Sequence, residues 1–474
     1  MEKFDLIIIG AGPGGYPAAI RAAQLGAKTA IIEKEELGGT CLNRGCIPTK
    51  TLIAGADVLE KIKNAAEFGI KVNEPEIDYS KMAARKDEVI TKLRNGIAQL
   101  LSANGVQSYE GAASFLSRNR IEVTNGKKKT KLEADKIIIA TGSVSTMPKF
   151  LPKSKNVVDS RGFLELDKLP KTLIVLGGGY IGCELACMAA KLGVEVTIVE
   201  LLEDVLVLLD KDVRSEVKRH MTKDLNINIL TGEALKNIKA TAAGVSGTAG
   251  REKLKAEMLL ASVGRSPVTQ GLKLENAGIK LDDQGYIEVN DYNRTSAANI
   301  YAIGDVNGGP QLAHAATSQG IIAAENAITK TSRKNETIVP GVIFSSPEVA
   351  LTGLTQARAK EEGQEVIIGK YHYQALGKAL ASNEPAGFVK WIVDAQTDQL
   401  LGAAVVGAHA TDLIAAASVA IRNELTAEEI GHTIHAHPTF GEIWMEAAHA
   451  VHGKAIHAAP PRGLHKPTAK KRKI

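Results

Sequence analysis

The sequence predicts an α/β protein in which one unit of strand, glycine turn, helix and strand occurs twice. The first copy, residues 4–33, reads FDLIIIGAGPGGYPAAIRAAQLGAKTAIIE, and the second, residues 172–200, reads TLIVLGGGYIGCELACMAAKLGVEVTIVE. In both copies the first glycine of the turn is followed 16 residues later by the glycine that ends the helical stretch. It is followed 23 residues later by a glutamate that ends the second strand. Equal spacing in two places indicates one supersecondary unit used twice.

Each turn has the pattern G-x-G-x-x-G between a strand and a helix. The glycines are Gly10, Gly12 and Gly15 in the first copy and Gly177, Gly179 and Gly182 in the second. The first glycine permits the tight turn, the second lets the backbone approach a pyrophosphate, and the third lets the helix pack against the strand. The pyrophosphate would meet free N–H groups at the helix N-terminus. The sequence therefore predicts two dinucleotide sites, which indicates electron transfer between two cofactors.

The glutamate that ends each unit, Glu33 or Glu200, has the position of the acid that accepts hydrogen bonds from a ribose diol. A 2′-phosphate beside Glu200 would face a like charge. No arginine or lysine follows Glu200 until Lys211. The second site is therefore predicted to prefer NAD over NADP.

The composition is that of an ordinary globular protein of two to four domains, with 474 residues, 44% of them apolar and 23% charged. No apolar run approaches the ~20 residues that span a bilayer. The chain enters a strand-like run almost at once, so we expect a cytoplasmic protein without a signal peptide. Four cysteines exclude a disulfide-stapled secreted scaffold.

The net charge of +5 lies in the last fifteen residues, which contain six basic side chains and no acid. Since these six supply +6, the rest of the chain carries about −1. The composition of this tail predicts a disordered, solvated segment, with docking to an acidic partner or nucleic acid as the lesser alternatives. We expect neither nucleic acid nor a membrane as a partner of the whole protein.

Two of the four cysteines, Cys41 and Cys46, lie in the segment GGTCLNRGCIPTK, residues 38–50. A close pair in a reducing compartment indicates metal or redox chemistry. Structural zinc needs four ligands, and no second pair complements this one. Cys183 and Cys187, one helical turn apart, are interpreted as small packing residues, and no metal site is predicted. Arg44, between the two thiols, either lowers their pKa values or faces outward.

Further motifs occur in a fixed order along the chain: ATGS at residues 140–143, YAIGDV at 301–306, LAHAA at 312–316 and HPTFGE at 437–442. With the cysteine segment and the two glycine units, they resemble the class I pyridine nucleotide–disulfide oxidoreductases from residue 3 to about 457. The resemblance implies an α/β protein with two Rossmann-like domains, one for FAD and one for NAD, and a C-terminal α+β dimerisation domain.

The resemblance also implies domain boundaries. The FAD-binding domain would be residues 1–145 and 276–340, with the NAD-binding domain inserted at residues 146–275. Residues 341–459 would form the interface domain, in which FVKWIVD and LLGAAVVGA are adjacent strands. Residues 460–474 would be the basic, disordered tail.

The cofactor residues carried over from the family fall into two sets. For FAD they are Gly10, Gly12, Gly15, Glu33, Lys50, Gly111, Thr141 and Gly142, together with Asp305 toward the ribityl chain and Ala313 and His314 at the isoalloxazine end. For NAD they are Gly177, Gly179, Tyr180, Gly182, Glu184, Glu200 and Gly264. Tyr180 would cover the flavin until the nicotinamide displaces it, with core packing as the alternative interpretation.

The resemblance assigns the redox chemistry as well. Cys41 and Cys46 would form a redox-active disulfide, with Cys46 on the flavin side and Cys41 on the substrate side. Lys50, one helical turn after Cys46, would pair with Glu184. In the C-terminal region, His437 would be the base and Glu442 the acid that orients it. The other histidines there, His432, His435, His449 and His452, are interpreted as surface or packing residues.

The activity implied is oxidation of dihydrolipoamide to lipoamide with NAD+ as acceptor. The carriers would be lipoylated proteins of 2-oxo acid dehydrogenase or glycine cleavage complexes, with the subunit-binding domain of such a complex as a further partner. The enzyme would be a homodimer in which His437 serves the partner subunit's site. The alternatives are another NAD(P)H-dependent disulfide reductase, such as one acting on glutathione disulfide, and a complex-bound scaffold. Arg44, Phe440 and Gly441 depart from the usual family residues and leave the substrate preference open.

Overall fold

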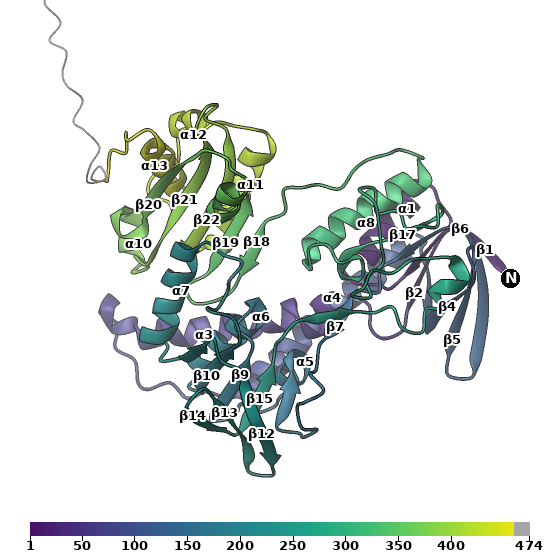
Figure 1. The fold of residues 1–474 in the computed structure, drawn as a ribbon, viewed down its shortest axis with the longest axis horizontal. Helices are drawn as coiled ribbons and strands as arrows, with labels where there is room; N and C mark the ends of the chain where they lie inside the picture. The colour runs from purple at the N-terminus through teal and green to yellow at the C-terminus, as the bar shows by residue number, and fades with distance from the viewer. Residues whose placement is uncertain (459–474) are drawn as a thin grey trace, which may run out of the picture. The chain divides into compact units, whose positions relative to one another are not determined.

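A computed structural model describes residues 1–458, so the predicted basic tail at 460–474 lies outside the described residues. The chain forms two compact units (Figure 1). The first contains residues 1–204 and 226–336. The second contains residues 205–225 and the residues from Thr337 on.

The first unit begins with a seven-stranded sheet in the order β3-β2-β1-β6-β5-β4, with β17 also paired to β6. β1 pairs with β2 and β6 in parallel, as do β2 with β3 and β17 with β6, whereas the β4-β5-β6 meander is antiparallel. The strands are β1 (Glu2–Ile9), β2 (Thr29–Glu33), β3 (Gln107–Glu110), β4 (Ala112–Ser117), β5 (Arg120–Asn125), β6 (Lys128–Ile139) and β17 (Ile300–Ala302). The helices beside it are α1 (Gly15–Gln24), α2 (Gly39–Arg44), α3 (Cys46–Lys63), α4 (Tyr79–Ala103) and α8 (Ala313–Ile328), with 3-10 turns η1 (Ala65–Phe68), η2 (Leu274–Ala277) and η3 (Gly304–Asn307).

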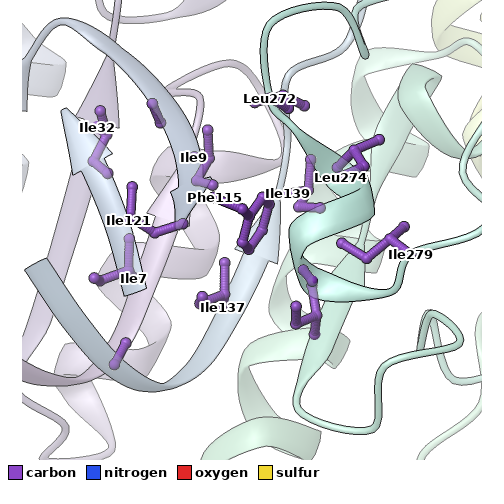
Figure 2. Packing of buried hydrophobic residues seen from close by; sticks show 14 of the residues in the cluster. Ile7, Ile9, Ile32, Phe115, Ile121, Ile137, Ile139, Leu272, Leu274 and Ile279 are labelled. Carbon is purple, nitrogen blue, oxygen red and sulfur yellow. The ribbon is translucent and has the colours of Figure 1, made fainter. Parts of the chain in front are cut away.

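The apolar run that begins the chain is buried on both faces of this sheet. Ile7 and Ile9 pack into one core with the β4–β5 hairpin and η2, as Figure 2 shows. Leu6 and Ile8 pack on the opposite face into a core with α1 and α8. A strand buried on both faces needs a continuous apolar sequence rather than an alternating one, which explains the run LIII before the glycine turn.

A second, fully parallel sheet follows in the same unit, in the order β11-β10-β9-β15-β8. Its strands are β8 (Val157–Asp159), β9 (Thr172–Leu176), β10 (Glu195–Glu200), β11 (Asn228–Thr231) and β15 (Met258–Ala261), with α5 (Ser160–Leu164) and α6 (Tyr180–Lys191). An antiparallel sheet of β12 (Leu235–Thr241), β13 (Gly244–Ala249) and β14 (Glu252–Ala256) accompanies it. β7 (Ser143–Ser145) and β16 (Arg265–Pro267) pair where the chain leaves and re-enters the region of the first sheet.

The second unit is built on a five-stranded antiparallel sheet in the order β18-β19-β22-β21-β20. Its strands are β18 (Gly341–Ile343), β19 (Val349–Gly353), β20 (Val366–His372), β21 (Gly387–Asp394) and β22 (Leu400–Gly407). Its helices are α7 (Lys211–Lys223), α9 (Gln356–Glu361), α10 (Gly377–Ala381), α11 (Ala410–Arg422), α12 (Ala427–His432) and α13 (Glu442–Val451), with the turn η4 (Tyr373–Ala375). The predicted pairing of FVKWIVD with LLGAAVVGA is confirmed as β21–β22.

A buried ion cluster explains why α7 groups with residues far along the chain. Lys390 on β21 is fully buried, and its Nζ lies 2.8 Å from both Asp210 Oδ2 and Asp212 Oδ1. The Asp210 carboxylate also accepts hydrogen bonds from the backbone N–H groups of Gln356 and Ala357. A buried ammonium of this kind persists only where it is paired. The predicted α/β class is confirmed. The predicted domain boundaries stay a prediction. The compact units are divided differently from them, because residues 205–225 group with the C-terminal residues.

Candidate functional site

The two glycine units end in the same hydrogen-bond arrangement. Glu33 accepts from Ala11 N (2.7 Å) and Glu35 N (2.9 Å), and Glu200 accepts from Gly178 N (2.5 Å) and Leu202 N (2.8 Å). Each glutamate therefore ties its own turn to the end of the second strand. Carboxylate oxygens keep lone pairs beyond these bonds, so each can still accept from two ribose hydroxyls.

The glycines show which positions the chain needs and which it leaves open for a ligand. A Cβ on Gly15 would lie 1.9 Å from Gly10 O, and one on Gly182 would lie 2.1 Å from Gly177 O, so close helix–strand packing forbids a side chain at both. A Cβ on Gly12 would approach only Gly39 Cα, at 3.9 Å. On Gly179, a Cβ would meet no atom of the described chain within 4 Å. Both second glycines thus border open space at a helix N-terminus, where a pyrophosphate fits.

In the described chain, neither α1 nor α6 has a side-chain cap at its N-terminus. The positive end of each helix dipole favours an anion at these two N-termini, although Gly15 N and Tyr16 N of α1 already donate to Gly12 O, at 3.0 and 3.2 Å. These residues fit a dinucleotide at each of the two glycine units, as the two cofactors FAD and NAD require.

We call each glycine turn, together with its closing glutamate, a dinucleotide cradle. The remaining residues predicted to contact the flavin lie around the first cradle. Thr141 Oγ1 donates to Val268 O at 2.7 Å, and Gly111 N donates to Glu33 O at 2.8 Å. Ala313 and His314 are the first two residues of α8, which the Thr317 hydroxyl joins to Pro13 O of the glycine turn at 2.8 Å. A second helix N-terminus therefore lies beside the first glycine turn.

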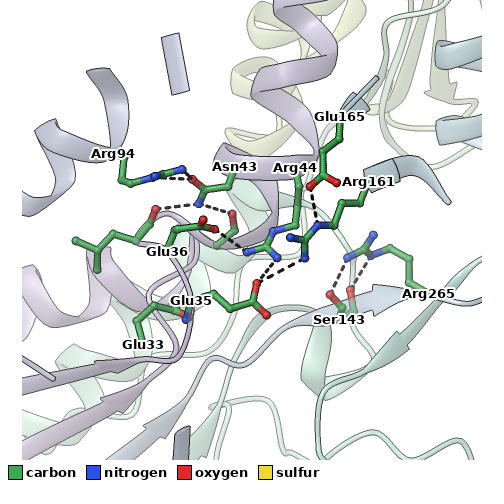
Figure 3. A network of polar contacts seen from close by, with 12 residues as sticks. Glu33, Glu35, Glu36, Asn43, Arg44, Arg94, Ser143, Arg161, Glu165 and Arg265 are labelled. Carbon is green, nitrogen blue, oxygen red and sulfur yellow. Dashed lines mark hydrogen bonds and ion pairs between the residues drawn. The ribbon is translucent and has the colours of Figure 1, made fainter. Parts of the chain in front are cut away.

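Asp305, in η3, is held by two residues that the sequence analysis did not single out. The Ser143 hydroxyl donates to Asp305 Oδ2, and Arg265 donates to Ser143 Oγ (2.7 Å) and to Ser143 O (2.8 Å). Figure 3 shows the two bonds between Arg265 and Ser143. Arg265 Nε also lies 3.7 Å from Asp305 Oδ2. Both residues adjoin predicted ones, Gly142 and Gly264, and that adjacency was the available signal.

The second cradle carries Tyr180 as the first residue of α6, half-buried, with its pKa raised by burial. Gly264 borders open space, since a Cβ there would meet no described atom within 4 Å. The residues after Glu200 are Leu201 and Leu202, which are 68% and 52% exposed. An apolar surface rather than a cation thus follows Glu200, the acid expected to bind the ribose hydroxyls, as expected of a site for NAD.

The two cysteines are free thiols, so the structure describes the reduced pair. Cys41 lies in α2, and Cys46 is the first residue of α3. Cys41 hydrogen-bonds to Cys46, which raises the pKa of Cys41 far above its usual value, with burial adding to the rise. The same bond lowers the pKa of Cys46 to about 7, against the effect of burial and with help from Lys50. The pair is therefore polarised, with Cys46 as the thiolate and Cys41 as the protonated partner.

The structure brings Lys50 and Glu184 together, with Lys50 Nζ 2.7 Å from Glu184 Oε2 and the glutamate side chain 10% exposed. The pair joins α3, which begins with Cys46, to α6 of the second cradle. Lys191, not singled out from the sequence, joins the same helices at 2.8 Å to both Asp57 and Glu60. These contacts fix the helix that presents Cys46 against the helix of the second cradle.

Arg44 faces away from the thiols. Its guanidinium contacts Glu35 and lies 3.1 Å from Glu36 Oε2, in the loop between β2 and α2 (Figure 3). The leading influences on the pKa values of the two cysteines do not include Arg44. Of the two interpretations left open by the sequence, the structure favours the one in which Arg44 faces away from the thiols, toward Glu35 and Glu36.

His437 and Glu442 lie together in the second compact unit, with His437 on the segment before α13 and Glu442 as the first residue of that helix. His437 Nδ1 is 2.8 Å from Glu442 Oε1, and Thr439 N donates to Glu442 Oε2 at 2.7 Å. Although burial opposes it, these hydrogen bonds lower the pKa of Glu442 and keep it a carboxylate. The His437 side chain is 77% exposed and the nearby Ile434 is 96% exposed. The arrangement fixes the ring through Nδ1 and leaves Nε2 to exchange a proton.

Cys183, His435 and His452 have structural partners, and Cys187 is buried. Cys183 is fully buried and donates to Gly178 O at 3.3 Å, while Cys187 is 2% exposed. His452 lies 3.2 Å from Asp398, and His435 lies 2.8 Å from Thr433 O. Within residues 1–458, no group of three histidine, cysteine or acidic side chains is arranged to hold a metal ion. No helix in that part of the chain is long and apolar enough to span a membrane.

Two family models match the chain. Residues 4–320 match the pyridine nucleotide-disulphide oxidoreductase model. Residues 339–448 match the dimerisation domain of the pyridine nucleotide-disulphide oxidoreductases. The first match contains both glycine units and the cysteine pair, and the second contains His437 and Glu442.

Similar proteins agree with these matches. The dihydrolipoyl dehydrogenase of Chlamydia pneumoniae is 41% identical over 97% of this chain and 99% of its own, and that of Bacillus subtilis strain 168 is 42% identical over 96% and 97%. Among solved structures, LpdA from Mycobacterium tuberculosis has a TM-score of 0.88 at 28% identity, over 94% of this chain and 99% of its own. The HOCl-induced flavoprotein disulfide reductase RclA from Escherichia coli has a TM-score of 0.86 at 29% identity, over 94% and 99%. The chain belongs to the pyridine nucleotide-disulphide oxidoreductase family, in the branch of the dihydrolipoyl dehydrogenases, which use FAD and NAD(H).

Proposed function

We propose that this protein is a dihydrolipoyl dehydrogenase, which oxidises dihydrolipoamide to lipoamide and reduces NAD+ to NADH. The relatives of that name, at about 40% identity over nearly the whole chain, favour it over a reductase of another disulfide. The observation that carries the proposal is the polarised thiol pair on α2 and α3, joined by Lys50 and Glu184 to the helix of a second dinucleotide cradle. A dithiol substrate needs such a pair, and NAD+ needs such a cradle.

The chain's own residues would hold both cofactors. The first cradle, with Gly12 and Glu33, would hold FAD together with Asp305. The second cradle, with Gly179 and Glu200, would hold NAD. When bound, FAD accepts two electrons from the reduced thiol pair, and NAD+ accepts them as hydride. Lys50 keeps positive charge near Cys46, which favours the thiolate over the thiol.

The thiol chemistry balances as a disulfide exchange. A thiolate of dihydrolipoamide attacks Sγ of Cys41 in the Cys41–Cys46 disulfide, forms a mixed disulfide and releases Cys46 as a thiolate. The second substrate thiol then attacks the substrate sulfur of that mixed disulfide, so lipoamide leaves and Cys41 takes a proton. The substrate has lost two electrons and the cysteine pair has gained them. The unequal pKa values of the reduced pair match this division, with Cys46 as the leaving thiolate.

His437 would accept the proton of the first attacking substrate thiol at Nε2 and return it to Cys41, and it would then hold the proton of the second substrate thiol as an imidazolium. Glu442, held as a carboxylate by His437 and Thr439, stabilises the imidazolium that forms. The base and the cysteines belong to different compact units. We propose that His437 of the partner subunit completes each site, in a homodimer joined through the matched dimerisation domain.

We further propose that the substrate is presented by lipoylated carrier proteins in the cytoplasm, with the subunit-binding domain of a 2-oxo acid dehydrogenase complex as a docking partner. The relatives' names support the dithiol, and the low cysteine content fits a reducing compartment.

The proposal is tested by steady-state rates of the flavin-loaded protein. We expect rapid turnover with dihydrolipoamide and NAD+, and at least tenfold lower kcat/KM with NADP+ because of the charge of Glu200. Glutathione disulfide with NADH or NADPH should turn over negligibly. Robust turnover of glutathione disulfide beside negligible oxidation of dihydrolipoamide would overturn the proposal.

A further inference from the structure

A cavity in the first compact unit is lined by none of the residues assigned to the cofactors or the thiol chemistry. Its volume is about 280 Å³, and it is lined by α2 with the residues just before it, α3, α4 and α5. This is close to the lower limit of about 300 Å³ for small-molecule sites, so a small metabolite would fill it. Asn43 and Arg44, from between the two cysteines, are part of its lining.

Three of the four cations that line this cavity already have acidic partners. Arg44 is paired with Glu35 and Glu36. Arg161 Nε lies 2.9 Å from Glu165 Oε1. Lys86, which is 5% exposed, has Asp87 at 2.9 Å and donates to Leu164 O at 2.9 Å. These charges are balanced locally and need no ligand.

Arg94 is the exception. Its Nε and Nη2 donate to Asn43 Oδ1, at 3.0 and 2.8 Å, and within residues 1–458 its guanidinium has no carboxylate partner (Figure 3). The amide of Asn43 is fixed, because its Nδ2 donates to both Leu37 O and Gly39 O at 2.9 Å. A neutral oxygen thus orients the guanidinium without neutralising it, and a group oriented before binding loses little entropy when a ligand arrives.

We propose that this cavity binds a small, hydroxylated organic anion. A carboxylate or phosphoryl group would pair with Arg94, the one lining cation without an acidic partner among the described residues. The carboxylates of Glu36, Asp87 and Glu165 also line the cavity and would repel a ligand with several charges. They accept hydrogen bonds from hydroxyl groups, so a polyhydroxylated body with one anionic group matches the lining in both respects.

The test measures binding to the flavin-loaded protein by isothermal titration, with NAD+ present at saturation so that the second cradle is filled. The probes share a six-carbon hydroxylated body: gluconate carries a carboxylate, glucose 6-phosphate carries a phosphoryl group, and glucose carries no charge. We expect saturable binding of at least one of the two anions and none of glucose. Whichever anion binds identifies the anionic group that the site takes.

Arg94→Gln should weaken that binding at least tenfold, since a hydrogen bond to a charged group contributes that much. Arg94→Lys, which keeps the charge but loses the planar fork, should fall between the two. Arg85→Gln, at an exposed arginine of the same helix, is the control and should bind like the wild type. Unchanged thermal melting of Arg94→Gln would show that it folds.

The proposal is overturned if neither anion binds the wild type up to 10 mM, or if Arg94→Gln binds as tightly as the wild type. Because the readout is binding and not turnover, this result is independent of the proposed dihydrolipoamide activity.

Discussion

Glu33 and Glu200 close the two dinucleotide cradles in the same way. Each glutamate accepts a hydrogen bond from the backbone N–H of the residue after the first glycine and another from the residue two positions after the glutamate itself. The chain then continues differently. After Glu33 a short loop leads into α2 and α3 with the two cysteines. After Glu200 the exposed Leu201 and Leu202 follow, and no reactive side chain does.

The two cradles share their hydrogen-bond arrangement, so only the chain that follows each of them distinguishes their roles. The first cradle lies next to the helix that carries Cys41, so a cofactor held there would exchange electrons with the thiols. The second cradle is joined to the helix that begins with Cys46 through α6, by way of Glu184 and Lys50. Under the proposed function, the same glycine unit would hold the cofactor that takes electrons from the thiols in one copy and the final acceptor in the other.

Neither cradle contains the proposed base, His437. Removing this base should have the largest effect on turnover. His437→Gln is expected to lower turnover by roughly 10²–10⁴-fold, the range lost with a general base. Purified mixed dimers of one Cys46→Ser chain and one His437→Gln chain should regain about half the wild-type rate, because one of their two sites is intact if His437 acts in the partner subunit. Mixed dimers with only background activity would place the base in the same chain as its thiols.

The second glycines test the comparison of the cradles directly. Gly12→Ala and Gly179→Ala both add a Cβ that the chain itself tolerates. Gly12→Ala should lower the flavin content of the purified protein. Gly179→Ala should raise KM for NAD+ about tenfold and leave flavin content and thermal melting unchanged. Loss of flavin from Gly179→Ala instead would show that the two cradles are assigned the wrong way round.

The link through Lys50 predicts a smaller, pH-dependent effect. Because the pKa of Cys46 is lowered to about 7, the thiolate of the reduced protein should dominate above that pH and disappear as the pH falls through it. Lys50→Met removes a charge that lowers this pKa, so the midpoint of an absorbance titration of the thiolate should move above 7. Lys61→Met, at an exposed position near the end of α3, should leave it unmoved.

The sequence predicted those parts of the fold and the site whose residues lie close together along the chain at fixed spacings. The glycine turns and their glutamates lie within thirty residues, and each spacing reflects a backbone requirement, such as the close approach at Gly15. The partners of Lys191 and Ser143 lie more than 100 residues away, and tertiary packing alone brings them together. The direction of Arg44 also depends on the loop before α2, which carries no periodic signal.

The central claim, that Cys46 is the thiolate facing the cofactor of the first cradle, is tested most directly by absorbance of the two-electron-reduced protein. Wild type and Cys41→Ser should both show a long-wavelength charge-transfer band between a thiolate and the flavin, and Cys46→Ser should show none. A band that survives in Cys46→Ser and is lost in Cys41→Ser would contradict the polarity of the thiol pair described above.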